Sequence, residues 1–320
     1  MTTTIPSQPA IRVSGLRKSF GGQVVLDGID LDVAEGTVFA LLGPNGAGKT
    51  TTVQILSTLI GADGGEARVA GHDVAVEPDL VRAAIGVTGQ LSAVDNLLTG
   101  EENLILMADL RHLGRREGRR RAAELLDQFD LTDAARKPAA TYSGGMRRRL
   151  DLAMGLVGDP RIVFLDEPTT GLDPRSRHTM WQIIRELVAG GVTILLTTQY
   201  LDEADELADR IALLDHGSVV AEGTAEQLKR RIPGGHIRLQ FAHPDELELA
   251  ARILGEEVSR DDEALTLQVP SDGGVKSLRA VLNQLDGASI EVSDLSIHTP
   301  DLDDVFLALT GQPDKEKEIA

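Results

Sequence analysis

The chain has 320 residues, 42% of them hydrophobic and none of them cysteine, and its formal net charge is −18. The lack of cysteine excludes disulfides and thiolate metal sites and fits a reducing cytoplasm, while the acidity argues against nucleic-acid binding, which depends on clustered Lys and Arg. No apolar run approaches the roughly 18 residues of a membrane-spanning helix. The polar start, residues 1–9, lacks the features of a secretory signal, so we expect a chain that does not cross a bilayer.

The length favours one domain of about 200–250 residues and a smaller second one. Residues 236–320 carry 18 acidic and 7 basic side chains, a net charge of −11, so the negative charge is concentrated at the C-terminal end. The Pro-Gly-Gly run within residues 231–235 breaks regular structure at the same place. We predict a polar tail over 1–9, a main domain over 10–232, an accessory domain over 236–311 and a frayed tail over 312–320.

The first strong motif follows an apolar run of strand length, Val38–Leu42, and precedes a helical segment, Thr51–Leu56. It has the pattern G-x-x-x-x-G-K-[ST], which cradles phosphate groups. Its residues are Gly43, Pro44, Asn45, Gly46, Ala47, Gly48, Lys49 and Thr50, and Thr51 follows. Backbone N–H groups at a helix N-terminus bind anions, Lys49 would reach the β- and γ-phosphates, and the Thr50 hydroxyl would ligate Mg²⁺. The motif predicts a nucleoside triphosphate site.

Two further apolar runs, Ile162–Leu165 and Val192–Leu196, do not alternate with polar residues, as expected of strands buried on both faces. Such strands, alternating with helical patterns, predict a mainly parallel sheet with crossover helices. Ligands of these sheets bind beyond the carboxyl ends of the strands, so Asp166, Glu167 and Gln199 are expected near the phosphate loop. Asp166 would hold Mg²⁺ through water, and Glu167 would accept a proton from an attacking water.

Between about residues 91 and 140 the pattern is helical, because apolar residues recur at i, i+3, i+4 and i+7. These residues are Ala122, Leu125, Leu126 and Phe129. We predict a helical subdomain inserted at this place. It contains the basic segment 115–121, which is either a solvated helix face, the favoured interpretation, or a contact for anionic lipid headgroups or a partner.

Alternating runs after residue 235 predict three half-buried strands, Ile237–Phe241, Leu265–Val269 and Ile290–Val292. An amphipathic helix ending near Gly311 is predicted by the spacing of Leu302, Val305, Phe306 and Leu309. We expect a small α+β accessory domain with no catalytic constellation and with its acidic residues on a solvated surface.

A combination of motifs in the middle of the chain is more specific than any one of them. The segment Tyr142-Ser143-Gly144-Gly145-Met146-Arg147-Arg148-Arg149 precedes the run that ends in Asp166-Glu167-Pro168, and Gly171-Leu172-Asp173 follows. With the phosphate loop, this order resembles the ATP-binding subunits of ABC transporters over about residues 13–223. The segment Thr197-Thr198-Gln199-Tyr200-Leu201-Asp202-Glu203-Ala204 is similar to the daunorubicin/doxorubicin-resistance type. The resemblance implies an α/β fold, a P-loop NTPase core of the ABC ATPase class.

The resemblance also implies roles for residues that are uninformative alone. Gln90 matches the glutamine loop, which senses Mg²⁺ and water and faces the membrane subunit, and Phe20 matches the position that stacks on adenine. The ATP site of the opposite subunit in a head-to-tail homodimer would be completed by Ser143, Gly144 and Gly145. Asp173 would link the two sites across that interface. From the residues alone, Ser143 and Asp173 are also interpretable as helix caps, and Phe20 as a core residue.

The implied function is that of an energising ATPase that uses ATP and Mg²⁺. The partner would be a separate membrane permease, which would export a hydrophobic drug or lipid. The chain would contact the membrane through this permease, at the cytoplasmic face. The substrate would be selected by the permease, so its nature rests on analogy. No nucleic-acid partner is expected.

Three residues depart from the family pattern. Gln199 replaces the usual γ-phosphate-sensing histidine, Met146 replaces a Gln, and Thr170 replaces a Ser. Gln donates a hydrogen bond but cannot acquire the charge of imidazolium, so hydrolysis is expected to persist at a lower rate.

Two other functions compete with transport. A soluble, non-transport ABC ATPase would usually show two phosphate loops in one chain or a very long coiled-coil insertion, and this chain has neither. A nucleotide-binding switch with negligible turnover is disfavoured by Glu167. A neighbouring gene for a six-span permease would support transport.

Overall fold

The computed structural model describes residues 9–89, 93–231, 235–255, 258–271, 274–298 and 300–310. Gln90, nearly all of the predicted N-terminal tail and the whole of the tail over 312–320 lie outside the described residues. The chain divides into two compact units, residues 1–225 and 226–320. The division precedes the boundary predicted near residues 231–235, because nearly all of the short helix α8 (Ala225–Lys229) belongs to the second unit.

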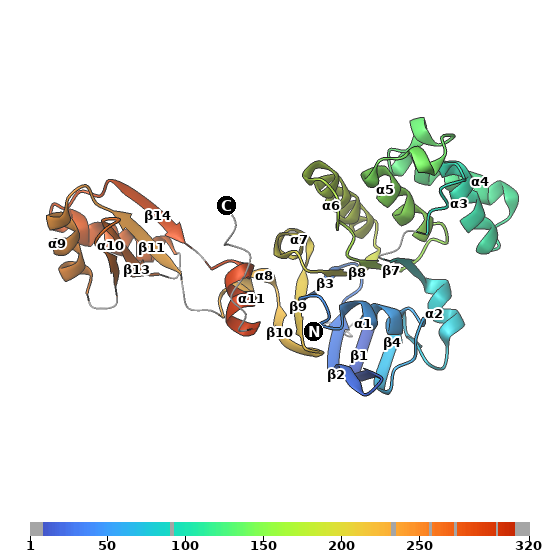
Figure 1. The fold of residues 1–320 in the computed structure, drawn as a ribbon, viewed down its shortest axis with the longest axis horizontal. Coiled ribbons are helices and arrows are strands. Elements are labelled where there is room, and N and C mark those ends of the chain that lie inside the picture. Colours follow the sequence, from blue (N-terminus) through green and yellow to red (C-terminus); the bar gives the residue numbers. More distant parts are fainter. Residues whose placement is uncertain are drawn as a thin grey trace, which may run out of the picture. The chain divides into compact units, whose positions relative to one another are not determined.

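Two sheets form the first unit and share one apolar core with helix α1 (Figure 1). The antiparallel sheet has the order β2-β1-β4-β5, from Gln23–Val33, Ile11–Phe20, Gly64–Val69 and His72–Asp73. The six-stranded sheet has the order β10-β9-β3-β8-β7-β6, from Ser218–Gly223, Arg210–Asp215, Val38–Leu42, Thr193–Thr198, Ile162–Asp166 and Ile85–Thr88. Its strands are parallel except β10, which is antiparallel to β9.

The central strands β3, β7 and β8 are buried along their whole length. Their apolar runs leave no polar side to face water, so each strand must be covered on both faces. Phe39 of β3 and Phe164 of β7 are fully buried in the core that also contains Ile55 of α1. The mainly parallel sheet predicted from these runs is confirmed.

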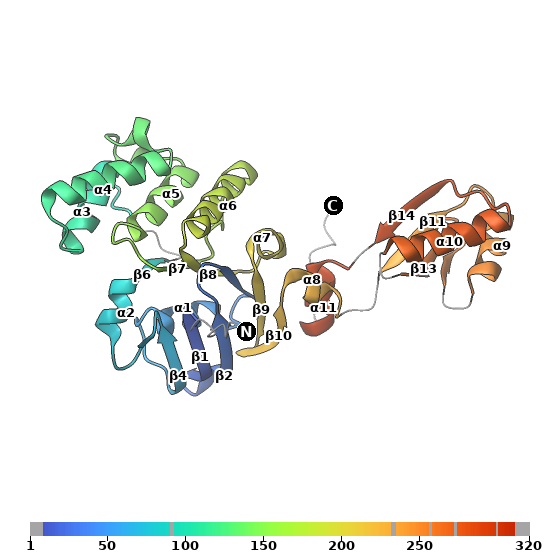
Figure 2. The same ribbon diagram turned by 180° about the vertical axis from the view of Figure 1, so that it is seen from behind.

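Seven α-helices belong to the described part of the first unit: α1 (Lys49–Leu56), α2 (Pro78–Ala84), α3 (Gly100–Leu110), α4 (Arg115–Gln128), α5 (Gly144–Gly155), α6 (Pro174–Ala189) and α7 (Leu201–Leu207). Two short 3₁₀ turns, Thr132–Ala134 and Ala139–Thr141, connect α4 to α5. Helices α3, α4 and α5 pack together beside the β7 and β6 end of the sheet (Figures 1 and 2). No described helix is both long enough and apolar enough to span a bilayer.

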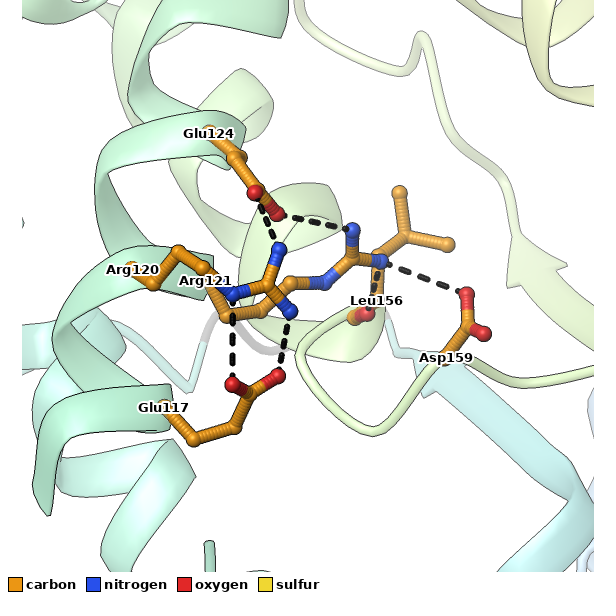
Figure 3. A network of polar contacts seen from close by, with 6 residues as sticks. All are labelled: Glu117, Arg120, Arg121, Glu124, Leu156 and Asp159. Atoms are coloured by element: carbon orange, nitrogen blue, oxygen red, sulfur yellow. Dashed lines mark hydrogen bonds and ion pairs between the residues drawn. The ribbon is translucent and has the colours of Figure 1, made fainter. Parts of the chain in front are cut away.

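The basic segment 115–121 forms the first half of α4 (Figure 3). Arg120 pairs with Glu117 and Glu124 of the same helix. The Arg121 Nη2 atom donates to the Leu156 carbonyl at 3.0 Å, so this side chain attaches α4 to the C-terminal end of α5. The solvated-face interpretation fits Arg120, which is exposed and paired within its own helix, whereas Arg121 is largely buried against α5.

The second unit contains a four-stranded sheet of order β12-β13-β11-β14, with all neighbours antiparallel. The strands are Ser259–Asp261, Thr266–Pro270, His236–Gln240 and Asp294–His298, and the helices besides α8 are α9 (Pro244–Leu254), α10 (Val275–Gly287) and α11 (Leu302–Thr310). Apolar residues of β11, β13, α9 and α10 form a separate core that includes Leu239, Leu247, Leu267 and Leu285.

The predicted strand over Ile290–Val292 is wrong, because β14 begins at Asp294. The Ile290 N–H donates to the Leu285 carbonyl at 3.1 Å and closes the C-terminal end of α10, so it is not available for a sheet. Pairing with β11 starts only where Asp294 lies opposite Gln240. Strand β12 was not predicted from the sequence because all of its residues are exposed and it shows no apolar alternation.

Strand β6 is pressed against α5 at a glycine. A Cβ atom on Gly86 would lie 2.5 Å from the Gly155 carbonyl oxygen, whereas one on the exposed Gly61 would meet nothing within 4 Å. We expect Gly86→Ala to lower the free energy of unfolding by about 1–3 kcal/mol, as overpacking does. Urea denaturation of both variants tests this, and equal midpoints for Gly86→Ala and Gly61→Ala would show that β6 moves away without cost.

Candidate functional site

The phosphate loop, residues 43–50, connects β3 to α1 and requires glycine where it touches neighbouring strands. A Cβ atom on Gly43 would lie 2.1 Å from the Leu214 carbonyl oxygen of β9. Gly48 has φ of 109°, and a Cβ atom there would lie 2.5 Å from the Leu26 side chain of β2. The loop between these glycines, with Pro44, Asn45, Gly46 and Ala47, is partly exposed at its tip.

Helix α1 begins at Lys49 with Gly48 as its N-cap, which has no side chain to satisfy the first backbone N–H groups. Thr50 and Thr51 complete the first turn. The N–H groups of this turn carry the positive end of the helix dipole, and an anion satisfies them in place of a capping side chain. The described loop therefore fits a phosphate group.

Lys49 is 4% exposed, and its Nζ atom donates to the carbonyls of Gly43 at 2.7 Å and Pro44 at 3.0 Å. The Glu167 Oε1 atom lies 3.8 Å from the same ammonium. Burial lowers the pKa of Lys49, and the charges of Glu167 and Asp166 oppose this effect. A buried ammonium that bonds mainly to neutral carbonyls gains from an anionic partner, and a phosphate group provides one.

Asp166 ends β7 and is 3% exposed. Its Oδ1 atom accepts hydrogen bonds from the hydroxyls of Thr50, at 3.2 Å, and Thr197. No cluster of three or more acidic or histidine side chains that would hold a metal occurs among the described residues. One hydroxyl and one carboxylate nevertheless fit Mg²⁺, because this ion usually takes few protein oxygens and keeps waters and substrate phosphates as its other ligands.

Glu167 has a left-handed backbone with φ of 48°, which costs about 1–3 kcal/mol for a residue other than glycine. Its N–H donates to the backbone oxygen and the hydroxyl of Thr197, both at 3.1 Å. Its Oε2 atom accepts from the Thr170 hydroxyl at 3.2 Å, so Thr170 retains the hydroxyl of the Ser that it replaces. The carboxylate thus lies between Lys49 and Thr170.

The segment Ser143–Gly145 lies at the start of α5 and forms a second group with the start of α6. Ser143 is the N-cap of α5, because its Oγ atom accepts from the Met146 N–H at 3.3 Å. A Cβ atom on Gly145 would lie 2.6 Å from the Ser176 hydroxyl, so the two helices begin in contact. A pocket of about 210 Å³ lies beside them, with Arg149 in its wall.

Asp173 caps α6, as one of the two interpretations predicted. Its carboxylate accepts from the Ser176 N–H at 3.0 Å and from the Ser176 hydroxyl at 2.6 Å. These hydrogen bonds lower the pKa of Asp173. The same side chain therefore fixes Ser176, which Gly145 contacts.

Phe20 and Gln199 lie at two other strand ends. Phe20 ends β1, is 49% exposed, and has the Lys18 ammonium 5.3 Å from its ring centre, so it is not a core residue. Gln199 is half-buried directly after β8. Gln90 lies outside the described residues, and Gly89 and Ala93 are its nearest described neighbours.

Two polar residues at this site, one fully buried and one largely buried, were missed from the sequence. Glu203 of α7 is fully buried, and its Oε1 atom accepts from the Thr169 hydroxyl at 2.8 Å and from Trp181 Nε1 at 3.1 Å. Arg148 of α5 donates to backbone carbonyls of the loop after β7. Both residues lie in segments that resemble the family, 142–149 and 197–204, but the sequence does not show which groups their long side chains contact.

The six-stranded sheet, the phosphate loop and the inserted helices α3, α4 and α5 together define a P-loop ATPase core of the ABC class. The model of the ABC transporter family matches residues 26–170. The chain is 50% identical to daunorubicin resistance ATP-binding protein DrrA2 of Streptomyces coeruleorubidus over 97% of both chains. It is 51% identical to daunorubicin/doxorubicin resistance ATP-binding protein DrrA of Streptomyces peucetius, over 95% of this chain and 93% of that one. This chain belongs to the ABC transporter ATP-binding family.

A more distant relative and solved structures agree with this assignment. Nod factor export ATP-binding protein I of Sinorhizobium fredii is 37% identical over 97% of this chain and 88% of its own length. An ATP-binding subunit of an ABC transporter superposes with a TM-score of 0.63 at 31% identity, over 69% of this chain and 92% of that one. A dimeric ATP-binding cassette bound to ADP and Pi superposes with a TM-score of 0.61 at 26% identity, over 67% of this chain and 98% of that one. The fold and the ability to bind ATP are therefore those of the family.

The burial of Glu203 leads to a pH-dependent prediction. Burial raises the pKa of Glu203 above its ordinary value, more than its hydrogen bonds and Arg177 lower it. The folded state thus favours the protonated form of Glu203. The stability linked to this preference is fully present below the ordinary pKa of a glutamate and is lost as the pH rises through the raised pKa of Glu203 in the folded state.

Glu203→Gln keeps an acceptor for Thr169 and Trp181 but has no charge to bury. We expect its free energy of unfolding to exceed that of the parent most at about pH 8 and to approach it toward about pH 5. Glu206→Gln on the exposed side of the same helix is the control, with a small effect. A stability difference for Glu203→Gln that stays constant with pH in urea denaturation would contradict the prediction.

Proposed function

We propose that this chain is the ATP-hydrolysing subunit that powers export of a hydrophobic drug or lipid through a separate membrane permease. The observation that carries the proposal is the convergence of Lys49, Thr50, Asp166 and Glu167 at the phosphate loop. The names of relatives that span nearly the whole chain, which refer to daunorubicin and doxorubicin resistance and to Nod factor export, support transport as the purpose of hydrolysis. Because those names refer to different compounds, selection of the substrate is assigned to the permease.

In this proposal ATP lies with its phosphates on the loop over residues 43–51. Lys49 exchanges its carbonyl partners for the β- and γ-phosphate oxygens, and the first N–H groups of α1 bind the same anion. The exposed ring of Phe20 stacks on the adenine. Thr50 and Asp166, through water for the latter, would hold Mg²⁺, with Gln90 as a further ligand, and the ion when bound neutralises phosphate charge.

Glu167 is proposed as the general base. A water attacks the γ-phosphorus, its proton passes to the Glu167 carboxylate, and the bond from the γ-phosphorus to the bridging oxygen breaks to give ADP and phosphate. Thr170 holds one carboxylate oxygen, and the Thr197 contacts fix the strained backbone that aims it. Gln199, at the end of the adjacent strand β8, donates a neutral hydrogen bond to the γ-phosphate.

Two copies are proposed to close around two ATP molecules in a twofold arrangement. Ser143, Gly144 and Gly145 of one copy would bind the ATP held by the phosphate loop of the other, and Asp173 would lie at the interface. The exposure of Ser143 and Gly144 and the positive end of α5 support this role. The chain would act at the cytoplasmic face, held at the membrane by the permease.

Removing only the proton-accepting ability of Glu167 tests both the base and the dimer. Glu167→Gln keeps the size of the side chain, so we expect ATP to bind, turnover to fall about 10²–10⁴-fold and a dimer to accumulate. Sedimentation velocity with MgATP measures this. Lys49→Ala is the matched control, which should bind little ATP and remain monomeric. A Glu167→Gln chain that hydrolyses at the parent rate and stays monomeric at high ATP would refute both assignments.

Replacement of Gln199 tests the neutral γ-phosphate contact. Gln199→Ala removes one hydrogen bond to a charged group, about 1.5–3 kcal/mol, so kcat should fall about tenfold to a hundredfold at saturating MgATP. Gln199→His should restore activity and add a pH-dependent step near the usual histidine pKa of about 6.5. An Ala variant with the parent kcat would mean that another residue senses the γ-phosphate.

A further inference from the structure

The Arg148 side chain of α5 donates to backbone carbonyls with all three of its guanidinium nitrogens, and two of these nitrogens bind residues 166–168 at the end of β7, which are called the catalytic loop below. Nε donates to the Pro168 carbonyl at 2.8 Å, and Nη2 donates to the carbonyls of Asp166 and Glu167, each at 3.0 Å. Nη1 donates to the Gly89 carbonyl at 2.9 Å, directly after β6. One side chain thus joins three consecutive peptide groups after β7 to the end of a different strand.

Asp151, one turn further along α5, extends this set of contacts. Its Oδ2 atom lies 3.4 Å from Arg148 Nη1, and its side chain is only 3% exposed. Its Oδ1 atom accepts from the Ala93 N–H at 2.9 Å. Arg148 and Asp151 therefore bind the described residues on both sides of positions 90–92, one through a carbonyl and the other through an N–H.

We infer that Arg148, supported by Asp151, is the positioning residue for Glu167, an inference that rests on the proposed function. Glu167 has a left-handed backbone, and its strain is retained only if neighbouring groups fix it. Thr197 holds the Glu167 N–H from the β8 side, and Arg148 holds the carbonyl of the same residue from the α5 side. The direction of the carboxylate follows from these two attachments.

The chemistry of the contact set requires arginine. Guanidinium offers five N–H donors in a planar fork, whereas the lysine ammonium is a point charge with three donors that cannot reach four separated carbonyls. The next residue does not substitute for it, because Arg149 Nη1 donates to the Phe129 carbonyl at 2.8 Å on another side of α5. The contact set is therefore specific to position 148.

The same geometry connects three moving parts of the proposed cycle. Helix α5 carries Ser143–Gly145 at its start and Arg148 one turn later, so a shift of this helix displaces the carbonyls of the catalytic loop. A shift of Gly89 or Ala93 acts on the same pair of side chains. Arg148 thus connects α5 and Gly89 to the backbone of the proposed general base.

The test compares Arg148→Lys with Arg121→Lys in the full chain. Both substitutions keep the charge, and Arg121 also donates to a backbone carbonyl, that of Leu156, while its ion pairs are with Glu124 and Asp159 (Figure 3). We expect Arg148→Lys to lower kcat about tenfold to a hundredfold with the Kd for MgATP changed less than about twofold, since misplacement of a catalytic group affects turnover. Arg121→Lys should retain the parent kcat.

Hydrogen exchange provides a readout that does not need hydrolysis. We expect Arg148→Lys to exchange faster than the parent at the amides of Glu167, Thr169 and Ala93, and Arg121→Lys to match the parent there. Unchanged exchange at these amides, or a kcat equal to the parent, would overturn the inference. If the parent chain binds ATP without turnover, the proposed function fails, and the exchange measurement still decides the role of Arg148.

Discussion

The register of three parallel strands determines how the proposed catalytic residues at their carboxyl ends lie relative to one another. Thr197 of β8 is opposite Leu41 of β3 on one side and Asp166 of β7 on the other. The phosphate loop leaves β3 just after this level, so Lys49 and Thr50 reach the carboxylates that end β7. A slip by one residue would displace a strand by about 3.3 Å and turn its side chains to the opposite face. The hydrogen bond from Thr197 to Asp166 fixes the level at which the strands meet.

Charge at the proposed catalytic centre is stabilised by hydrogen bonds to backbone carbonyls and by carboxylate partners. Lys49 is buried against carbonyls and the Glu167 carboxylate, and Arg148 is largely buried against carbonyls and Asp151. Burial lowers the pKa of both basic groups, and neighbouring carboxylates oppose this in each case. Such sites are costly to form and sensitive to the loss of one partner. This cost is consistent with a site that uses the same charges to bind and convert a phosphate compound.

The sequence predicts the parts that depend on local pattern. Unalternating apolar runs gave β3, β7 and β8, and the phosphate motif gave the loop and α1, because burial and glycine content are visible in the residues themselves. Strand β12 and the true start of β14 were not predictable, since one is fully exposed and the other depends on how α10 ends. Arg148 and Glu203 act through atoms far from their own backbone, and their partners become known only from the fold.

The contact between the starts of α5 and α6 has an electrostatic consequence. Each helix N-terminus carries about half a positive charge, which the Asp173 carboxylate offsets at α6, and Gly145 lets the two ends lie side by side near Arg149 and Arg175. The chain as a whole carries −18, so two copies repel each other at long range. In the proposed dimer, the positive end of α5 would face a nucleotide on the other copy and would offset that repulsion only over short distances. Association of two copies should therefore become faster as salt screens the long-range repulsion between them. The gain should end when the Debye length becomes shorter than the distance over which the positive end of α5 attracts the nucleotide, because salt then screens this attraction as well.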